Sequence, residues 1–129
     1  MNWQFLSRRA VEAIHVEQLQ RHGGAAGLRD ENALESALAR AQNKVAYGEP
    51  DHAEIAAAYA FGLGRNHAFV DGNKRTAIVT AVTFLLVNGY NFTADDGLLY
   101  SFTMGLAAGE IDETGAAAFF RDHTVRIDP

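Results

Sequence analysis

Residues 76–87 include no charged side chain, and their apolar members lie on nearly every side of a helix. A helix of this kind must be buried among other elements of the fold. Its β-branched residues also suit a strand, but the length of the segment and its lack of alternation favour a helix. The run is too short to span a membrane. We therefore expect a buried central helix that begins near Asn73 and ends at Asn88-Gly89.

The other segments with apolar residues at helical spacing are each bounded by a capping residue or by glycine. They run from a Ser7 cap to Gly23-Gly24, from an Asp30 cap through Val45, over about residues 51–66, from an Asp95 or Asp96 cap to near Gly109, and onward from Asp112. Their expected inward residues include Val11, Ile14, Leu19, Leu34, Ala37, Leu38, Ala41, Ile55, Ala58, Tyr59, Leu63, Leu98, Leu99, Phe102, Leu106, Phe119 and Phe120. Residues 90–93 are expected to form a short extended piece. The pattern predicts an all-α fold in a single domain over residues 1–129.

The composition excludes several classes of protein. The chain has 129 residues, of which 48% are hydrophobic and 21% charged, as in an ordinary soluble globular domain. It contains no cysteine, so a disulfide framework and a thiolate metal site are both excluded. The formal net charge of −5 provides no basic footprint for nucleic acid. Since the N-terminus lacks a signal pattern, we expect a cytoplasmic protein that binds neither membranes nor nucleic acid directly.

The most informative stretch is residues 67–75, which read His-Ala-Phe-Val-Asp-Gly-Asn-Lys-Arg and lead into the buried helix. Lys74 and Arg75 fall in the first turn of that helix, where the macrodipole is positive and cations are disfavoured. The free backbone N–H groups of the same turn suit an anion. Two cations make sense there when a polyanion joins them, and phosphate is the most reasonable one. Gly72 lets the backbone approach that anion closely.

The side chains of this stretch suit different tasks beside bound phosphate. Arg75 can grip two oxygens at once, and Lys74 can act as a point charge. Asn73 can cap the helix or donate its amide to an oxygen. Asp71 suits Mg²⁺, a hard cation that prefers oxygen ligands. His67 can change protonation near neutral pH and is a candidate general base for an attacking hydroxyl.

Ordinary structural explanations exist for each of these residues taken alone. A histidine before a helix is usually a cap or a hydrogen-bonded core residue, Asp-Gly-Asn is a common turn, and Lys-Arg is often a solvated pair. Their joint occurrence in this order, at the start of a buried helix, favours the functional explanation. The P-loop, the dinucleotide-binding motif and the protein-kinase motifs are absent from the sequence. Phe69 is expected to anchor the loop in the core.

Residues 67–75 resemble the active-site motif of the Fic/Doc superfamily, His-x-Phe-x-Asp-Gly-Asn-x-Arg. The resemblance extends to the glycine-rich residues 23–30, to residues 41–47 and to residues 105–111. Members of the family that transfer AMP usually have glycine at position 74, whereas members of its death-on-curing (Doc) branch have lysine. Lys74 therefore resembles the Doc branch. Ala68 departs from the family pattern, because many relatives have proline at that position.

The resemblance implies a compact helical bundle that acts as an enzyme with ATP and Mg²⁺. The implied catalytic residues are His67, Asp71, Lys74 and Arg75, with His67 as the general base and Asp71 as the Mg²⁺ ligand. The residues implied to bind ATP are Gly72, Asn73, Lys74 and Arg75, with Arg65 as a helper. The implied activity is a toxin's: transfer of the terminal phosphate to a hydroxyl of the translation factor EF-Tu. A Phd-like antitoxin is the implied partner.

Two alternatives are compatible with the same residues. One is transfer of AMP, although the long cation Lys74 should crowd the usual diphosphate seat and favour a reversed ATP. The other is a non-catalytic Doc-like binding module, against which the intact His67 and Asp71 argue. The family's self-inhibitory motif, Ser/Thr-x-x-x-Glu-Gly/Asn, is absent, so inhibition has to come from a partner.

Two further features are left open or treated as structural. The remaining histidines show no metal-ligand spacing and are predicted to lie at the surface or at helix ends; they are His15, His22, His52 and His123. The many alanines of the second and third predicted helices suit close helix packing, or equally a shallow groove for a partner helix.

Overall fold

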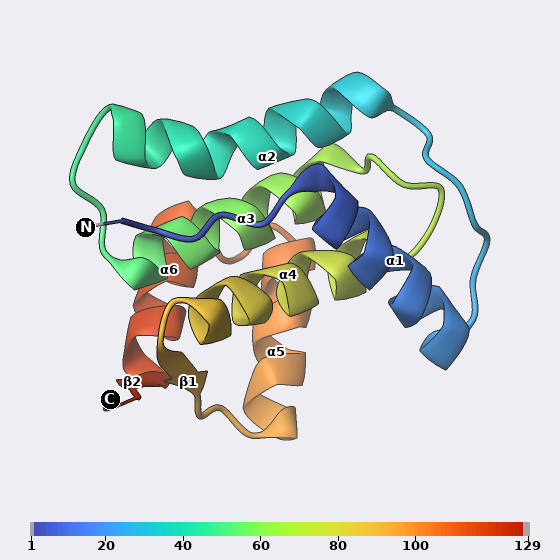
Figure 1. Ribbon diagram of the computed structural model, residues 1–129. Coiled ribbons are helices and arrows are strands. Elements are labelled where there is room, and N and C mark those ends of the chain that lie inside the picture. Colours follow the sequence, from blue (N-terminus) through green and yellow to red (C-terminus); the bar gives the residue numbers. More distant parts are fainter. Residues whose placement is uncertain (1, 128–129) are drawn as a thin grey trace.

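The computed structural model describes residues 2–127, and within them the chain forms six helices and one two-stranded sheet (Figure 1). In chain order the elements are α1 (Arg8–His22), α2 (Glu31–Ala46), α3 (His52–Asn66), α4 (Asn73–Val87), β1 (Tyr90–Phe92), α5 (Asp96–Ala107), α6 (Glu113–Asp122) and β2 (Thr124–Arg126). This arrangement confirms the predicted all-α bundle of about six helices. No helix in the described residues is both long enough and apolar enough to cross a membrane.

The helix boundaries follow the cap residues that the sequence shows. The side chain at each of five N-caps accepts a hydrogen bond from a backbone N–H in the first turn; the caps are Ser7, Asp30, Asp51, Asp95 and Asp112. A cap of this kind contributes about 1 kcal/mol to helix stability. Helix α4 differs, because its N-cap is Gly72 and no side chain caps it. The exception falls in the stretch that the sequence analysis singled out.

Helix α3 occupies the centre of the bundle, between α2 and α4 (Figure 1). It packs mainly on α2, α4 and α6. Many of its buried residues are small; these are Ala53, Ala56, Ala57, Ala58, Ala60 and Gly62. The prediction that α4 is the central helix is therefore wrong. Its early turns are buried, but Leu86 and Val87 in its last turn are 56% and 49% exposed.

The close approach of α2 and α3 resolves the question that the alanines left open. A methyl group placed on Gly62 would lie 3.3 Å from the carbonyl oxygen of Ala37 on α2. Ala37 and Ala41 are buried against this contact. The small residues at this contact therefore serve packing between these two helices.

Aromatic rings fasten the N-terminal segment to α4. The ring of Phe84 on α4 is fully buried, with the rings of Trp3, Phe5 and Tyr59 at centroid distances of 6.0, 6.4 and 5.4 Å. The hydroxyl of Tyr59 also accepts a hydrogen bond of 3.0 Å from the N–H of Leu6. Burying a phenylalanine side chain contributes roughly 2–3 kcal/mol, so this cluster orients α4 firmly against α3.

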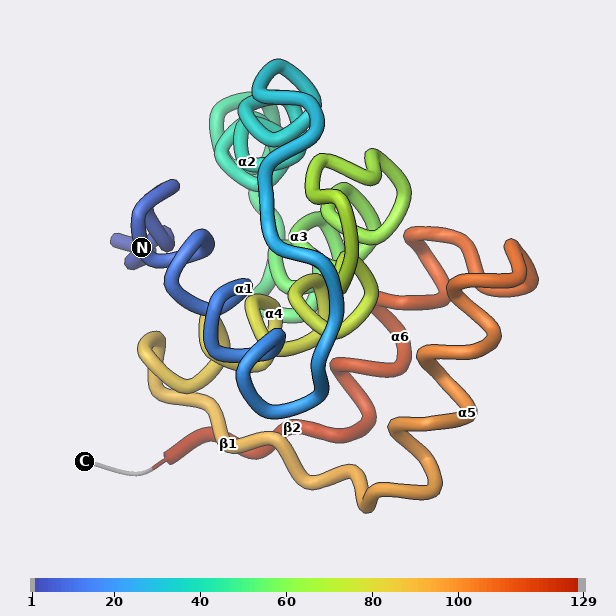
Figure 2. Tube along the Cα trace, turned by 90° about the vertical axis from the view of Figure 1, so that its right-hand side faces the viewer, coloured from blue at the N-terminus to red at the C-terminus, as the bar shows by residue number. Residues whose placement is uncertain are grey.

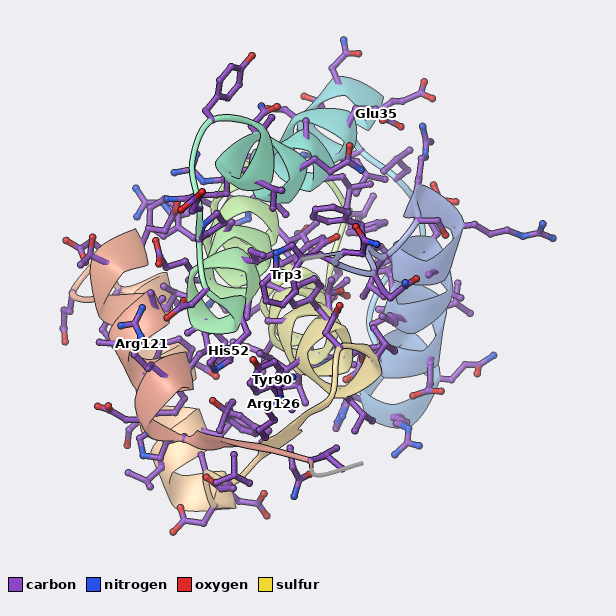
Figure 3. All side chains as sticks on the ribbon, turned by 60° about the vertical axis from the view of Figure 1, so that its left-hand side comes forward. Trp3, Glu35, His52, Tyr90, Arg121 and Arg126 are labelled. Carbon is purple, nitrogen blue, oxygen red and sulfur yellow. The ribbon has the colours of Figure 1, made fainter. Side chains whose placement is uncertain are left out.

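The short sheet joins the two ends of the C-terminal half. Strand β1 confirms the expected extended piece, and it pairs antiparallel with β2, with Tyr90 opposite Arg126. Strand β2 was not predicted, because three residues carry too little alternation to be recognised. Figure 3 shows His52, at the start of α3, beside Tyr90, and their rings stack at 3.8 Å. His52 and His123 confirm the prediction of helix-end histidines.

Two segments distant in sequence run side by side at one end of the bundle. Figure 2 shows the connection between α1 and α2 passing beside the connection between α3 and α4. The N–H of Val70 donates to the carbonyl oxygen of Gly27 at 3.0 Å, and the N–H of Arg29 donates to that of Ala68 at 2.7 Å. The glycine-rich residues 23–30 therefore lie against the loop that contains the predicted site.

Candidate active site

The N-terminus of α4 opens onto a pocket lined by the predicted site residues. Gly72 precedes the helix in the left-handed conformation, with φ of 77°, and its carbonyl oxygen accepts the N–H of Thr76 at 3.0 Å. The N–H groups of the first turn, which come before Thr76, have no intrahelical partner. The pocket has a volume of about 340 Å³ and is lined by His67, Val70, Asp71, Gly72, Asn73, Lys74 and Arg75. The positive end of the helix dipole therefore coincides with a hollow large enough for phosphate groups.

The side chain of Asn73 braces the loop. Its oxygen accepts the N–H of Phe69 at 3.0 Å, and its amide donates to the carbonyl oxygen of Phe69 at 2.9 Å. From the sequence, this side chain could either cap the helix or donate its amide to an oxygen. In the structure the amide donates to the carbonyl oxygen of Phe69. Phe69 itself is buried, as expected of an anchor. For a bound anion, Asn73 therefore offers its backbone N–H.

Asp71 is exposed, but backbone groups hold its carboxylate in place. The N–H of Gly72 donates to Oδ1 at 2.8 Å, and the N–H of Ala25 donates to Oδ2 at 3.3 Å. These two hydrogen bonds, the Gly72 bond first, hold the pKa of the carboxyl below its ordinary value. Asp71 is therefore an ionised, fixed and accessible oxygen donor.

The donor set around Asp71 fits Mg²⁺ bound together with phosphate. Each carboxylate oxygen keeps a lone pair beyond the one that its N–H partner uses. Among the described residues, no group of three or more histidine, aspartate or glutamate side chains is arranged to hold a metal ion. Mg²⁺ commonly binds through one or two carboxylates, with phosphate oxygens and water completing its octahedron. Asp71 suits that mode.

The glycine at position 24 explains how the two segments approach each other. A methyl group at Gly24 would lie 2.7 Å from Oδ2 of Asp71 and 2.9 Å from Cδ2 of Leu19. Its φ of 126° also disfavours any other residue. Gly24 thus leaves room for the Asp71 carboxylate and for the N–H of Ala25 that binds it.

The two cations of the first turn differ in how firmly they are held. Arg75 is partly buried, and its Nη2 donates to the carbonyl oxygen of Gly23 at 3.0 Å, while its buried Nε has no partner in the described residues. Lys74 is exposed. Arg75 is therefore a fixed guanidinium with donors to spare, and Lys74 is a flexible point charge.

His67 caps the end of α3 in an unfavourable backbone conformation. Its φ of 50° and ψ of 48° are left-handed, and among the described residues it is the non-glycine residue with positive φ. Strain of this kind costs on the order of 1 kcal/mol and is concentrated at functional sites. The imidazole is exposed and lines the same pocket as Asp71 and Lys74.

Arg65 lies beside this pocket and does not line it. It is exposed in the last turn of α3, with its guanidinium 5.1 Å from the centroid of the Phe61 ring. With Lys74 it borders a narrow apolar slot between α3, α4 and α5. The structure thus brings His67 and residues 71–75 together and leaves Arg65 at their edge.

His15 is the site residue that the sequence analysis missed. The prediction that it lies at the surface or at a helix end is wrong, because it is 4% exposed in the middle of α1. Its Nε2 lies 2.8 Å from the carbonyl oxygen of Asp71. The spacing carried a signal, since His15 follows the buried Val11 by four residues and precedes the partly buried Leu19 by four.

A larger hollow elsewhere has the wrong chemistry for ATP. It has a volume of about 490 Å³ and is lined by Arg40, Lys44, Glu54, Glu113 and neighbouring residues. Its cations are already paired, since Lys44 lies 2.9 Å from Glu113 and Arg40 forms an ion pair with the same carboxylate. A polyanion would gain little there. The smaller pocket at α4 has the unpaired cations and the helix N-terminus.

Comparison with known proteins points to one family. The family model described as Fic/DOC family matches residues 5–85. The chain is 37% identical over 117 residues to "Protein kinase doc" of Escherichia phage P1, covering 90% of this chain and 92% of that protein. It is 47% identical over 76 residues to "Toxin Doc" of Mycolicibacterium smegmatis, covering 57% of this chain and 58% of that protein.

A solved structure shares the fold. It is the N-terminal Fic domain, with bound ADP, of a VirB-translocated Bep effector protein from Bartonella quintana, with a TM-score of 0.52 and 18% identity. The match covers 76% of this chain and 48% of that one, so it spans about half the length of that structure. The family model and the phage relative both extend through the loop and the start of α4. The chain therefore belongs to the Fic/Doc family.

Proposed function

We propose that this protein is a Doc-type toxin that transfers the terminal phosphate of ATP to a hydroxyl group of another protein. The observation that carries the proposal is the pocket at the N-terminus of α4, which joins free N–H groups and two cations with a fixed carboxylate and an exposed imidazole. The names of the phage relative, "Protein kinase doc", and of the mycobacterial relative, "Toxin Doc", support the same proposal.

In this proposal the first turn of α4 holds the phosphates. The N–H groups of Asn73, Lys74 and Arg75 lie at the positive end of the helix dipole. Arg75 grips phosphate oxygens with the donors that Gly23 leaves free, and Lys74 neutralises charge. Asp71 would hold Mg²⁺, which supplies charge neutralisation when bound. Arg65 assists from the edge of the site.

His67 is the proposed general base. Its side chain takes the proton of the acceptor hydroxyl as the hydroxyl oxygen bonds to the terminal phosphorus. The bond from that phosphorus to the bridging oxygen breaks, and ADP leaves. Because phosphoryl transfer needs positioning and charge stabilisation above all, the place of His67 in the same pocket as the first turn of α4 supports this role.

Lys74 distinguishes this reaction from transfer of AMP. A long cation at the second position of the helix occupies space that glycine would leave to the two distal phosphates. We propose that ATP therefore binds reversed, with its terminal phosphate toward His67. A structure with bound nucleotide whose α-phosphate faces His67 would contradict this orientation.

The cellular assignments belong to the same proposal. We propose EF-Tu as the acceptor protein, a Phd-like antitoxin as the inhibiting partner, and the cytoplasm as the location. We also propose that residues 1–129 act as one Fic/Doc domain, since the match to the phage relative covers 92% of that protein.

A transfer assay tests the function directly. Purified protein, Mg²⁺ and EF-Tu are incubated with ATP labelled on either the terminal or the α-phosphate. We expect label on EF-Tu from the terminal phosphate alone, and a loss of roughly 100-fold or more in His67→Ala. His22→Ala, which changes an exposed histidine of α1, is the matched control. Label from the α-phosphate would show AMP transfer, and no label from either would contradict EF-Tu as the acceptor.

A further inference from the structure

His15 is a buried polar side chain to which the proposed mechanism gives no task. Its ring stacks on Phe69 at a centroid distance of 3.8 Å and an interplanar angle of 12°. Its Nε2 is 2.8 Å from the carbonyl oxygen of Asp71. A carbonyl oxygen only accepts hydrogen bonds, so Nε2 must carry the proton and donate it. His15 thus connects α1 directly to the backbone of the proposed Mg²⁺ ligand.

The hydrogen bond from His15 fixes the orientation of one peptide group. The carbonyl of Asp71 and the N–H of Gly72 belong to the same planar peptide unit and point in opposite directions. While His15 holds the carbonyl end, the N–H end donates to Oδ1 of the Asp71 carboxylate at 2.8 Å. The direction of the carboxylate is therefore tied to the imidazole through a rigid plane.

This peptide needs such a brace. Gly72 has φ of 77° and no side chain, so the peptide that precedes it can rotate at little cost. The packing leaves α1 close beneath it, since a methyl group on Gly72 would lie 3.3 Å from Leu19 and 3.6 Å from the His15 ring. Within the described residues, His15 is the side chain that hydrogen-bonds to the Asp71 carbonyl.

We propose that His15 is a positioning residue, which orients the Asp71 carboxylate for Mg²⁺ through the peptide between Asp71 and Gly72. The structural consequence stands on the geometry alone, and the catalytic consequence rests on the proposed function. A histidine that only filled space between α1 and Phe69 would be replaceable by another ring. A positioning histidine requires its donor.

A pair of variants separates the two properties of the imidazole. His15→Phe keeps a ring against Phe69 and removes the donor, whereas His15→Gln removes the ring and keeps an N–H donor of similar reach. His15→Leu is a second donor-free variant, and it keeps the test decisive if the phenylalanine variant unfolds at a lower temperature. His22→Phe makes the same chemical change at an exposed position of α1 and is the matched control.

The first readout is hydrogen exchange of the Gly72 amide in the free protein, measured by NMR. We expect exchange to rise about tenfold in His15→Phe and His15→Leu, which corresponds to loss of one hydrogen bond, and to stay near wild type in His15→Gln and His22→Phe. Unchanged exchange in both donor-free variants would overturn the proposal. This readout needs neither ATP nor an acceptor protein, so it stands even if the proposed function fails.

The second readout is the Mg²⁺ concentration that gives half-maximal transfer to the acceptor. Loss of an outer partner of a metal ligand typically lowers metal affinity or activity by about 10- to 100-fold. We expect a rise of that order in the donor-free variants and recovery in His15→Gln. A loss in His15→Gln, with His15→Phe near wild type, would show a packing role alone and overturn the proposal. Absence of transfer by the unmodified protein would count against the proposed function. The role of His15 would then be tested by hydrogen exchange of the Gly72 amide alone.

Discussion

Asp71 shows how a solvent-exposed side chain is made ready for a cation. The N–H groups of Gly72 and Ala25 lower the pKa of its carboxyl, so it stays ionised far below neutral pH. Because the pKa is lowered in the folded loop, the ionised carboxylate stabilises the loop at pH values above the ordinary pKa of the group. This contribution is lost as the pH falls through the lowered pKa. The sequence named Asp71, but its partner Ala25 lies on a distant segment that only folding brings near.

Asp71→Asn tests the charge of this residue separately from its shape. We expect transfer to fall at least about tenfold at every Mg²⁺ concentration, because an amide oxygen is a weaker ligand than a carboxylate. Stability at neutral pH should stay near that of wild type, since the residue is exposed. Initial rates and thermal unfolding measure the two effects. Activity equal to wild type would exclude Asp71 as the metal ligand.

Lys74→Gly tests whether this cation selects the transferred group. Removing the long side chain opens the seat for the distal phosphates, so terminal phosphate transfer should fall by about tenfold or more and AMP transfer should appear. Parallel assays with ATP labelled at either end give the ratio. If the ratio does not change, Lys74 contributes charge and not orientation.

At the residue scale, the sequence predicted which near neighbours lie together but not the contacts that form across the fold. Residues 67 and 71–75 gather at one pocket because they are near neighbours around one helix start. The burial of His15 depends on how α1 meets the loop, and the amide of Asn73 had two uses that its sequence position could not separate.

At the scale of elements, helix starts could be predicted from the sequence more easily than the packing of one helix on another. Ser7, Asp30 and Asp112 marked helix starts in the sequence because a cap acts within one turn, whereas the cap at Asp51 was not predicted and the choice between Asp95 and Asp96 was left open. The central place of α3 was not predictable from hydrophobicity alone. Alanine-rich α3 has smaller apolar side chains than α4, but it is buried on more sides because three helices pack against it.

A pair of glycine substitutions tests the close packing of α3. Gly62→Val places atoms against Ala37 and Arg40 on α2 and should lower the free energy of unfolding by about 1–3 kcal/mol. Gly64→Ala meets only the side chain of Ala77, at 3.8 Å, and should stabilise the helix by up to about 1 kcal/mol. Urea denaturation compares them. Equal effects would contradict the described contact between α2 and α3.

Glu113 links α6 to α2 and gives the fold a pH dependence. Burial alone raises the pKa of this carboxyl, but Lys44 and Arg40 outweigh it and hold that pKa below its ordinary value. We expect Glu113→Gln to lower the free energy of unfolding at pH 7 by about 1 kcal/mol. The difference should be lost as the pH falls through the lowered pKa of Glu113, because the wild-type carboxyl then becomes protonated. A difference that persists in acid would exclude the ion pairs as its cause.

At the scale of the whole molecule, an acidic chain places two neighbouring cations at the start of α4. The net charge is −5, and the cations of the larger hollow are matched by carboxylates, whereas Lys74 and Arg75 face the pocket at α4. The glycine-rich connection and α1 contact the loop at Asp71, through Ala25 and His15. The short loop between α3 and α4 thus places the predicted anion site at the start of a largely buried helix.

The central claim is that nucleotide phosphates bind at the N-terminus of α4. An NMR titration of the ¹⁵N-labelled protein with Mg²⁺ and a non-hydrolysable ATP analogue tests it without any acceptor protein. We expect the largest amide shifts to fall on Asn73, Lys74 and Arg75 and to be lost in Arg75→Ala. Shifts centred on Arg40 and Lys44, with residues 73–75 unmoved, would contradict it.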